Sequence, residues 1–158
     1  LRTENCELRT SLLINSRTDI ALAAGADGVH LRSDDIPAST ARAIWREAMS
    51  RDSRLGTRGS VIAVSCHSAS DIARAKSEGA DFAVFAPVFE KRDASGVRPR
   101  GLSALREACA TKIPVLALGG VTIENGPSCL AAGAAGVAAI RLFQENKIEE
   151  VVRALRAL

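Results

Sequence analysis

The chain has 158 residues and a formal net charge of +3, with one Trp, four Phe and no Tyr. This length suffices for a single domain, residues 1–158, with a real hydrophobic core. The small, dispersed charge and the scarcity of aromatic side chains argue against a nucleic-acid-binding surface, and no apolar run is long enough to cross a membrane. The four cysteines have neither C-x-x-C nor metal-ligand spacing, which favours a reduced, cytoplasmic protein.

Short apolar segments of strand length alternate with amphipathic, helix-like segments along the chain. Such continuous apolar strands are typical of a parallel sheet that helices cover. The predicted strands are Leu12–Asn15, Gly28–Leu31, Val61–Ser65, Phe82–Ala86, Val115–Leu118 and Gly136–Ile140.

A repeated Gly-Ala pair links the predicted helices to the strands that follow. Gly25, Gly79 and Gly133 are evenly spaced, and two strand–helix units lie between successive members. Each glycine is predicted to end a helix just before a strand. The length of the units matches an α/β fold of the (β/α)8 TIM-barrel type.

A closed barrel needs eight strands, so six strands predict that the first two strand–helix units are missing from this chain. On this interpretation Leu1–Arg9 is the tail of the second helix. Unpaired sheet edges would favour either a longer polypeptide or a homo-oligomer. The alternative is an open, doubly wound sheet of six strands.

The strongest functional signal is the stretch Ile113–Thr122, an apolar strand that ends in Gly119-Gly120. We expect a helix to follow at once, with Thr122 as its N-cap. The next strand runs straight into a helix, with Arg141 at the junction. Two such strand ends predict a phosphate site, and barrels place one after their last two strands. The alternative is a simple strand-to-helix turn.

Other polar residues fall at the predicted carboxyl ends of strands, where barrel active sites form. Asn15 either contacts a ligand or caps a helix. Asp34 and Asp35 either cap a helix before Pro37 or hold Mg²⁺. His30 is expected to be a hydrogen-bonded residue within its strand.

Further along, Ser65 and His67 end the third predicted strand, where a phosphate or hydroxyl contact is favoured over covalent catalysis. The segment Pro87–Gly101 is the longest loop at this end and is rich in basic residues. It is either a lid over a polyanion or a solvated loop.

The pattern as a whole resembles the thiamine-phosphate synthase / thiazole tautomerase superfamily. The matching text includes Leu13-Ile14-Asn15, Gly25–Leu31 with Asp35, Ser65 with His67, Pro87-Val88-Phe89, Ile113–Val121 and Gly133–Ile140. The match runs in order along nearly the whole chain. It implies a (β/α)8 barrel.

The resemblance implies a transferase that couples hydroxymethylpyrimidine diphosphate to thiazole phosphate and releases pyrophosphate, in thiamine biosynthesis. It implies that Asn15 and Ser65 contact the pyrophosphate or the pyrimidine and that Asp35 holds Mg²⁺. In the loop where the synthase has Thr-x-Thr-Lys, Lys91 or Arg92 could supply the positive charge for this substrate, with a different geometry. The resemblance further implies that the thiazole phosphate is bound by four residues near the last two strands: Gly119, Gly120, Ile140 and Arg141.

Several positions differ from the family pattern. Ser16 stands where the synthase has a second metal-binding Asp, and Pro87 stands where the tautomerase has a His. Arg141 replaces a Ser of the synthase. The alternatives are therefore a tautomerase-like isomerase that works without metal, and a non-catalytic barrel that binds a thiamine-related phosphate.

Overall fold

The computed structural model describes residues 10–51, 60–90 and 98–157. The strands are β1 (Leu13–Asn15), β2 (Gly28–Leu31), β3 (Val61–Cys66), β4 (Phe82–Phe85), β5 (Val115–Leu118) and β6 (Gly136–Ala138). The helices are α1 (Thr18–Ala23), α2 (Ala38–Arg51), α3 (Ala69–Ser77), α4 (Gly101–Cys109), α5 (Gly126–Ala131), α6 (Arg141–Gln144) and α7 (Ile148–Arg156).

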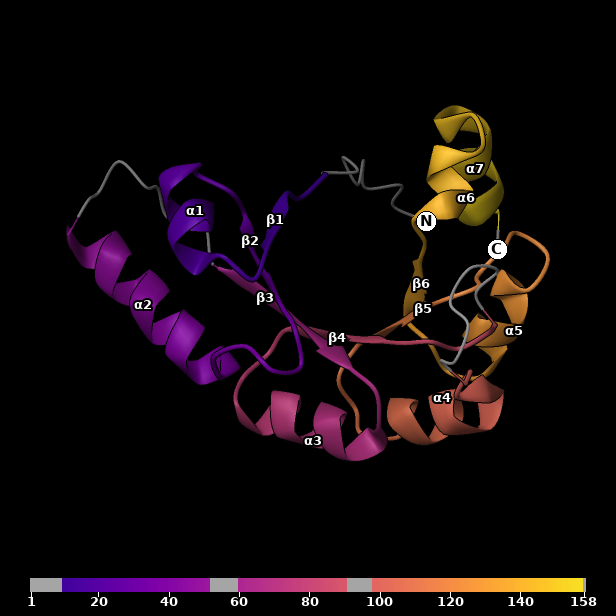
Figure 1. Cartoon of the computed structure of the whole chain (residues 1–158), viewed down its shortest axis with the longest axis horizontal. Helices are drawn as coiled ribbons and strands as arrows, with labels where there is room; N and C mark the ends of the chain where they lie inside the picture. The colour runs from indigo at the N-terminus through magenta and orange to yellow at the C-terminus, as the bar shows by residue number, and fades with distance from the viewer. Residues whose placement is uncertain (1–9, 52–59, 91–97, 158) are drawn as a thin grey trace, which may run out of the picture.

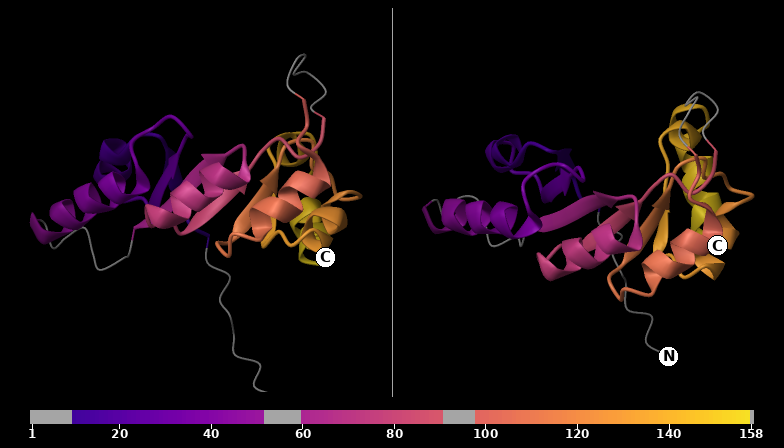
Figure 2. Two further views of the ribbon diagram at one scale, coloured as in Figure 1. Left: turned by 90° about the horizontal axis from the view of Figure 1, so that it is seen from below. Right: turned by 60° about the horizontal axis from the view of Figure 1, so that its bottom comes forward.

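All neighbouring strands pair in parallel, and their order in the sheet, β1-β2-β3-β4-β5-β6, is their order in the sequence. The sheet curls, and α1 to α5 cover its convex side, while none of the described helices lies on the concave side (Figures 1 and 2). A doubly wound sheet would reverse its strand order and carry helices on both faces. The predicted doubly wound alternative is therefore wrong, and the sheet has the form of a half-barrel.

The hydrophobic core lies between the sheet and the helices. Strand residues that face the helices, such as Val29, Ile62 and Phe85, are fully buried. Alternate residues point to opposite faces of a strand, and those on the concave face, such as Phe82 and Leu116, are only half-buried. Trp45 on α2 is buried in this core, as the helical pattern predicted.

The repeated glycines end three helices in the same way. Gly25, Gly79 and Gly133 all have positive φ, a conformation that L side chains rarely adopt. In each case the next residue's N–H donates to a carbonyl five residues back, at 2.9, 2.9 and 3.1 Å. This pattern is a Schellman motif, so the predicted helix ends are confirmed.

The Asp residues that follow two of these glycines tie neighbouring strands together. Asp27 accepts from the N–H of Leu12 at 2.9 Å, and Asp81 accepts from the N–H of Ile62 at 2.7 Å. Arg42 of α2 donates to Asp81 and to the Gly79 carbonyl, both at 2.8 Å. These contacts brace the amino ends of the strands, opposite the predicted site.

Two boundaries differ from the sequence prediction near the phosphate motif. The helix after Gly119-Gly120 begins only at Gly126, because a turn intervenes. Thr122 does not cap that helix, but its Oγ accepts from the N–H of Asn125 within the turn, at 3.3 Å. β6 ends at Ala138, two residues earlier than predicted.

Among the residues described, no helix is long and apolar enough to cross a membrane.

Candidate functional site

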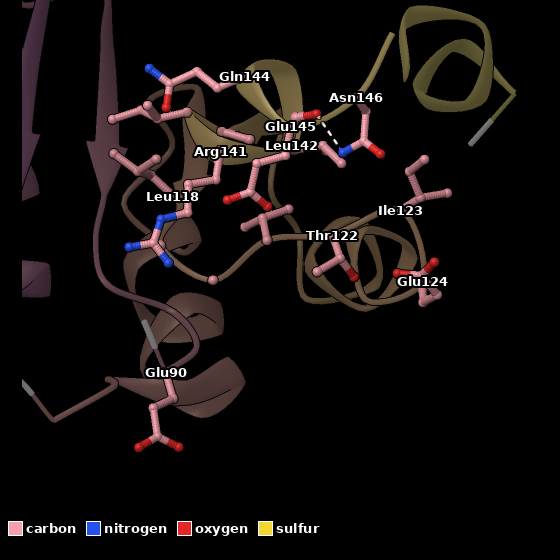
Figure 3. Close-up of a pocket in the computed structure, with 15 residues that line it drawn as sticks. Glu90, Leu118, Thr122, Ile123, Glu124, Arg141, Leu142, Gln144, Glu145 and Asn146 are labelled. Carbon is pink, nitrogen blue, oxygen red and sulfur yellow. Dashed lines mark hydrogen bonds between the residues drawn. The ribbon is translucent and has the colours of Figure 1, made fainter. Parts of the chain in front are cut away.

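An open pocket of about 660 Å³ lies at the carboxyl ends of β5 and β6 (Figure 3). Its lining comes from the segment after β5, from Glu90 after β4, and from α6 with the residues on either side of it. The structure therefore brings four of the predicted site residues into one pocket: Gly119, Gly120, Ile140 and Arg141.

The two glycines form the inner wall of the pocket, and they pack tightly. Gly119 and Gly120 have φ values of 99° and 64°. A Cβ on Gly119 would lie 2.7 Å from Pro87, and one on Gly120 would lie 2.4 Å from the Glu90 carbonyl oxygen. Both the backbone conformation and the lack of space therefore require glycine.

Backbone hydrogen bonds join this wall to the segment that follows β4. The N–H groups of Val88 and Phe89 donate to the carbonyls of Leu118 and Gly119, both at 2.9 Å. In a trans peptide the C=O and N–H point in opposite directions. Because the Gly119 carbonyl faces Phe89, the N–H of Gly120 is directed away from Phe89.

The N–H groups of Gly120 and Val121 donate to none of the residues that the structure describes. Both residues line the pocket. Successive free backbone N–H groups in a concave turn suit an anion. The wall is therefore equipped to bind a phosphate or carboxylate group.

The opposite side of the pocket is formed around α6. Ile140 is 64% exposed and directly precedes α6, whose first residue is Arg141. Figure 3 shows the Arg141 side chain extending between Leu118 and Glu90. A guanidinium group on this side complements the N–H groups of the glycine wall, because both favour anionic ligands.

The predicted residues on β1 to β3 do not line this pocket. Asn15 is exposed at the end of β1. The Asp35 carboxylate lies in the loop after β2, where it accepts from the Arg32 N–H at 2.7 Å. Lys91 lies outside the described residues, as does the rest of segment 91–97 in the middle of the loop interpreted as a lid.

Asp35 is held as a carboxylate by its neighbours. Burial raises the pKa of its carboxyl, but the nearby Ser16 hydroxyl, the Arg32 N–H and the Arg32 charge outweigh burial and lower that pKa. Ser16 Oγ is itself buried and makes no well-formed hydrogen bond to any described residue. It nevertheless lies close enough to the Asp35 carboxylate to lower the pKa of that group.

Ser65 and His30 form a pair on the concave face. Ser65 Oγ lies 3.0 Å from His30 Nε2, because the β2–β3 register places His30 opposite Ala63, two residues before Ser65. Burial lowers the pKa of His30, against the opposing influence of Asp35. His30 is thus the hydrogen-bonded strand residue that its position predicted.

His67 makes a different contact at the end of the same strand as Ser65. Its Nδ1 lies 2.7 Å from the Ala86 carbonyl oxygen. A carbonyl oxygen can only accept, so Nδ1 donates in this contact. His67 thereby joins the ends of β3 and β4.

A magnesium ion would find few protein ligands in this region. The described residues contain no group of three or more His, Cys, Asp or Glu side chains that could hold a metal ion. Asp35, with the buried Ser16 hydroxyl beside it, offers one carboxylate and one oxygen without a well-formed partner. These donors could hold Mg²⁺ only if phosphate and water oxygens supplied most of its ligands.

Sequence reasoning missed several residues of the pocket. Ile123, Leu142 and Asn146 line it, but ordinary turn and helix positions gave no reason to select them. Asn125, which lies directly behind the glycine wall, could have been found from the Thr-x-x-Asn spacing of a capping motif. Its contacts are described below.

The fold and pocket define a parallel α/β protein with an open pocket at the carboxyl ends of its last two strands. The family model of thiamine monophosphate synthase matches residues 3–143. The chain belongs to the thiamine monophosphate synthase family.

Individual relatives agree with this assignment. The chain is 46% identical over 152 residues to a Geobacter sulfurreducens protein provisionally named as a thiamine-phosphate synthase, covering 93% of this chain and 65% of that protein. It is 38% identical over 149 residues to the thiamine-phosphate synthase of Chlorobium luteolum, covering 92% and 65%. The chain thus spans slightly less than two thirds of the length of these relatives.

A solved structure supports the same family. The thiamine phosphate pyrophosphorylase of Pyrococcus furiosus superposes with a TM-score of 0.74 at 29% identity, covering 92% of this chain and 65% of that one. A 3-hexulose-6-phosphate synthase structure superposes with a TM-score of 0.61 at 23% identity and shows a likeness of fold alone.

Proposed function

We propose that this chain forms the pyrophosphate-releasing site of a thiamine-phosphate synthase. Family membership gives the reaction class, and the pocket supplies the observation that carries the proposal. This observation concerns Gly120 and Val121, whose N–H groups donate to none of the described residues and which line a pocket together with Arg141. A phosphate monoester such as the thiazole phosphate fits these groups.

In the proposed reaction, the bond between the pyrimidine methylene carbon and the diphosphate oxygen breaks, and pyrophosphate leaves with the bonding pair. The thiazole nitrogen forms a new C–N bond to the same methylene carbon. Holding the thiazole by its phosphate fixes this nitrogen in place and removes most of the entropic cost of bringing two substrates together. Positive charge develops on the methylene carbon, so departure of the leaving group is the step that needs stabilisation.

Asn15, Ser65 and Asp35 are proposed to serve the diphosphate substrate. All three lie at or beyond the carboxyl ends of β1 to β3, at the same edge of the sheet as the pocket. Lys91 is proposed for the same role from the family resemblance. Asp35 would hold Mg²⁺, which neutralises a leaving diphosphate when bound.

We further propose that the active protein is a closed (β/α)8 barrel to which this chain contributes six strands. In the described part of the chain, β1 and β6 each pair on one side only, and the concave face is incompletely buried. Two further strand–helix units would close the sheet. The length of the relatives is consistent with this.

The decisive experiment is an assay of pyrophosphate release from both substrates by the longest natural polypeptide that contains this chain. Mg²⁺-dependent release that is lost in Asp35→Ala would support the synthase. Binding of thiazole phosphate without release would instead favour the isomerase or the non-catalytic alternative, for which the single carboxylate near Ser16 is the supporting observation.

A further inference from the structure

The glycine wall of the pocket is held from behind by the side chain of Asn125. Its Nδ2 donates to the Gly120 carbonyl at 2.9 Å, and its Oδ1 accepts from the Thr122 N–H at 2.8 Å. Its backbone N–H donates to Thr122 Oγ at 3.3 Å. One residue thus makes three hydrogen bonds to the segment that follows β5.

These bonds determine which backbone atoms face the pocket. The Gly120 carbonyl and the Val121 N–H belong to one peptide and point in opposite directions. Because Asn125 holds the carbonyl, the N–H of Val121 is directed away from Asn125. Asn125 Oδ1 also accepts from the Thr122 N–H, which would otherwise need another hydrogen-bond acceptor.

Glycine makes such a support necessary. Gly119 and Gly120 can adopt many backbone conformations, so the Gly120–Val121 peptide has freedom to rotate in the absence of a restraint. A rotated peptide would present its carbonyl oxygen to the pocket, where it would repel an anion. A bound phosphate would then first have to restore the favourable orientation.

We propose that Asn125 is a positioning residue that orients the Gly120–Val121 peptide for anion binding. The inference rests on the phosphate site of the proposed function, and it adds a residue that does not line the pocket. Asn125 acts through the backbone and does not touch the ligand. Its loss is expected to reduce phosphate affinity rather than to unfold the protein.

The test is a titration with inorganic phosphate, followed by ¹⁵N–¹H spectra in which the amides of Gly120 and Val121 are resolved. In Asn125→Asp, the acceptor for Thr122 is kept, but the donor to Gly120 is lost. This variant also adds a negative charge. Gln144→Glu is the matched control, because Gln144 is exposed, lines the pocket and undergoes the same change from amide to carboxylate.

We expect Asn125→Asp to bind phosphate about tenfold more weakly than Gln144→Glu, a loss equivalent to one hydrogen bond. We also expect the ligand-free Gly120 and Val121 amide signals to move in Asn125→Asp and to stay in place in Gln144→Glu. Asn125→Ala, which lacks both side-chain bonds, should bind phosphate about tenfold more weakly than the wild type.

The two proposals fail in different ways. If phosphate binds to the wild type and equally well to Asn125→Asp and Gln144→Glu, Asn125 is not a positioning residue, while the phosphate site stands. If phosphate moves neither the Gly120 nor the Val121 signal in the wild type, the phosphate site itself is wrong.

Discussion

His30 Nε2 and Ser65 Oγ lie 3.0 Å apart and join β2 to β3 across the concave face of the sheet. Burial depresses the pKa of His30 below its usual value near 6.5. Between the depressed value and 6.5 the unfolded chain binds more protons than the folded one, so stability rises with pH in this window. The folded protein therefore loses stability as the pH falls below about 6.5.

His30→Gln should remove this part of the pH dependence, because Gln does not titrate. The measurement is the urea midpoint of unfolding at several pH values between 4 and 8, about the range in which His and the carboxylates titrate. Carboxylate titration remains in both proteins and serves as the internal reference. Parallel pH curves for wild type and variant would contradict the prediction.

Ser16→Asp should strengthen Mg²⁺ binding. Ser16 has a φ of 62°, and its buried hydroxyl lies near the Asp35 carboxylate, so an Asp here would place two carboxylates together. We expect at least about tenfold tighter Mg²⁺ binding, since ligand charge sets affinity for hard cations.

Ser16→Asn is the control for this substitution. Asn tolerates the left-handed backbone as well as Asp does but adds no charge. Calorimetric titration with MgCl₂ should therefore distinguish the two variants. Equal Mg²⁺ affinity in Ser16→Asp and Ser16→Asn would show that position 16 does not reach the ion.

Gly120→Ala should destabilise the protein far more than Gly25→Ala. The two glycines have nearly the same φ, 64° and 62°, so the conformational cost is alike, about 1–2 kcal/mol. A Cβ at Gly25 meets nothing within 4 Å, whereas one at Gly120 meets the Glu90 carbonyl oxygen at 2.4 Å. We expect an additional loss of about 2 kcal/mol or more for Gly120→Ala in chemical denaturation. Similar losses for the two variants would mean that the wall of the pocket yields easily.

Arg42→Ala should cost about 2 kcal/mol of unfolding free energy, because it removes charged hydrogen bonds to Asp81 and to the Gly79 carbonyl. Arg42→Lys should recover only part of this, since an ammonium group cannot reproduce the fork of the guanidinium. Arg46→Ala, an exposed change on the same helix, should stay within about 0.5 kcal/mol of the wild type. Denaturant midpoints measure all three.

The sequence predicted the six strands and the helix-ending glycines well, because both depend on local pattern. A glycine such as Gly79 is favoured where a helix ends with positive φ. The continuous apolar run Val115–Leu118 predicts a buried strand without knowledge of the rest of the fold. The grouping of Gly120 with Arg141 also followed, because consecutive parallel strands end at one edge of a sheet.

Contacts set by register and by turns could not be predicted in the same way. The His30–Ser65 pair depends on which residues of β2 and β3 lie opposite each other, and a shift of one residue would separate them. The late start of α5 follows from the turn that Thr122 and Asn125 close. The helix propensities of these residues alone do not predict that turn.

The pairing of Val88 and Phe89 with Leu118 and Gly119 makes Phe89 a natural reporter position. Phe89 does not line the pocket, yet its Cβ would lie only 2.8 Å from a Cβ placed on Gly120. A fluorine atom on this ring would sense movement of the glycine wall from outside the space that a ligand fills. Ligand affinity and wall motion could then be followed by ¹⁹F spectroscopy in one sample, without a label in the pocket.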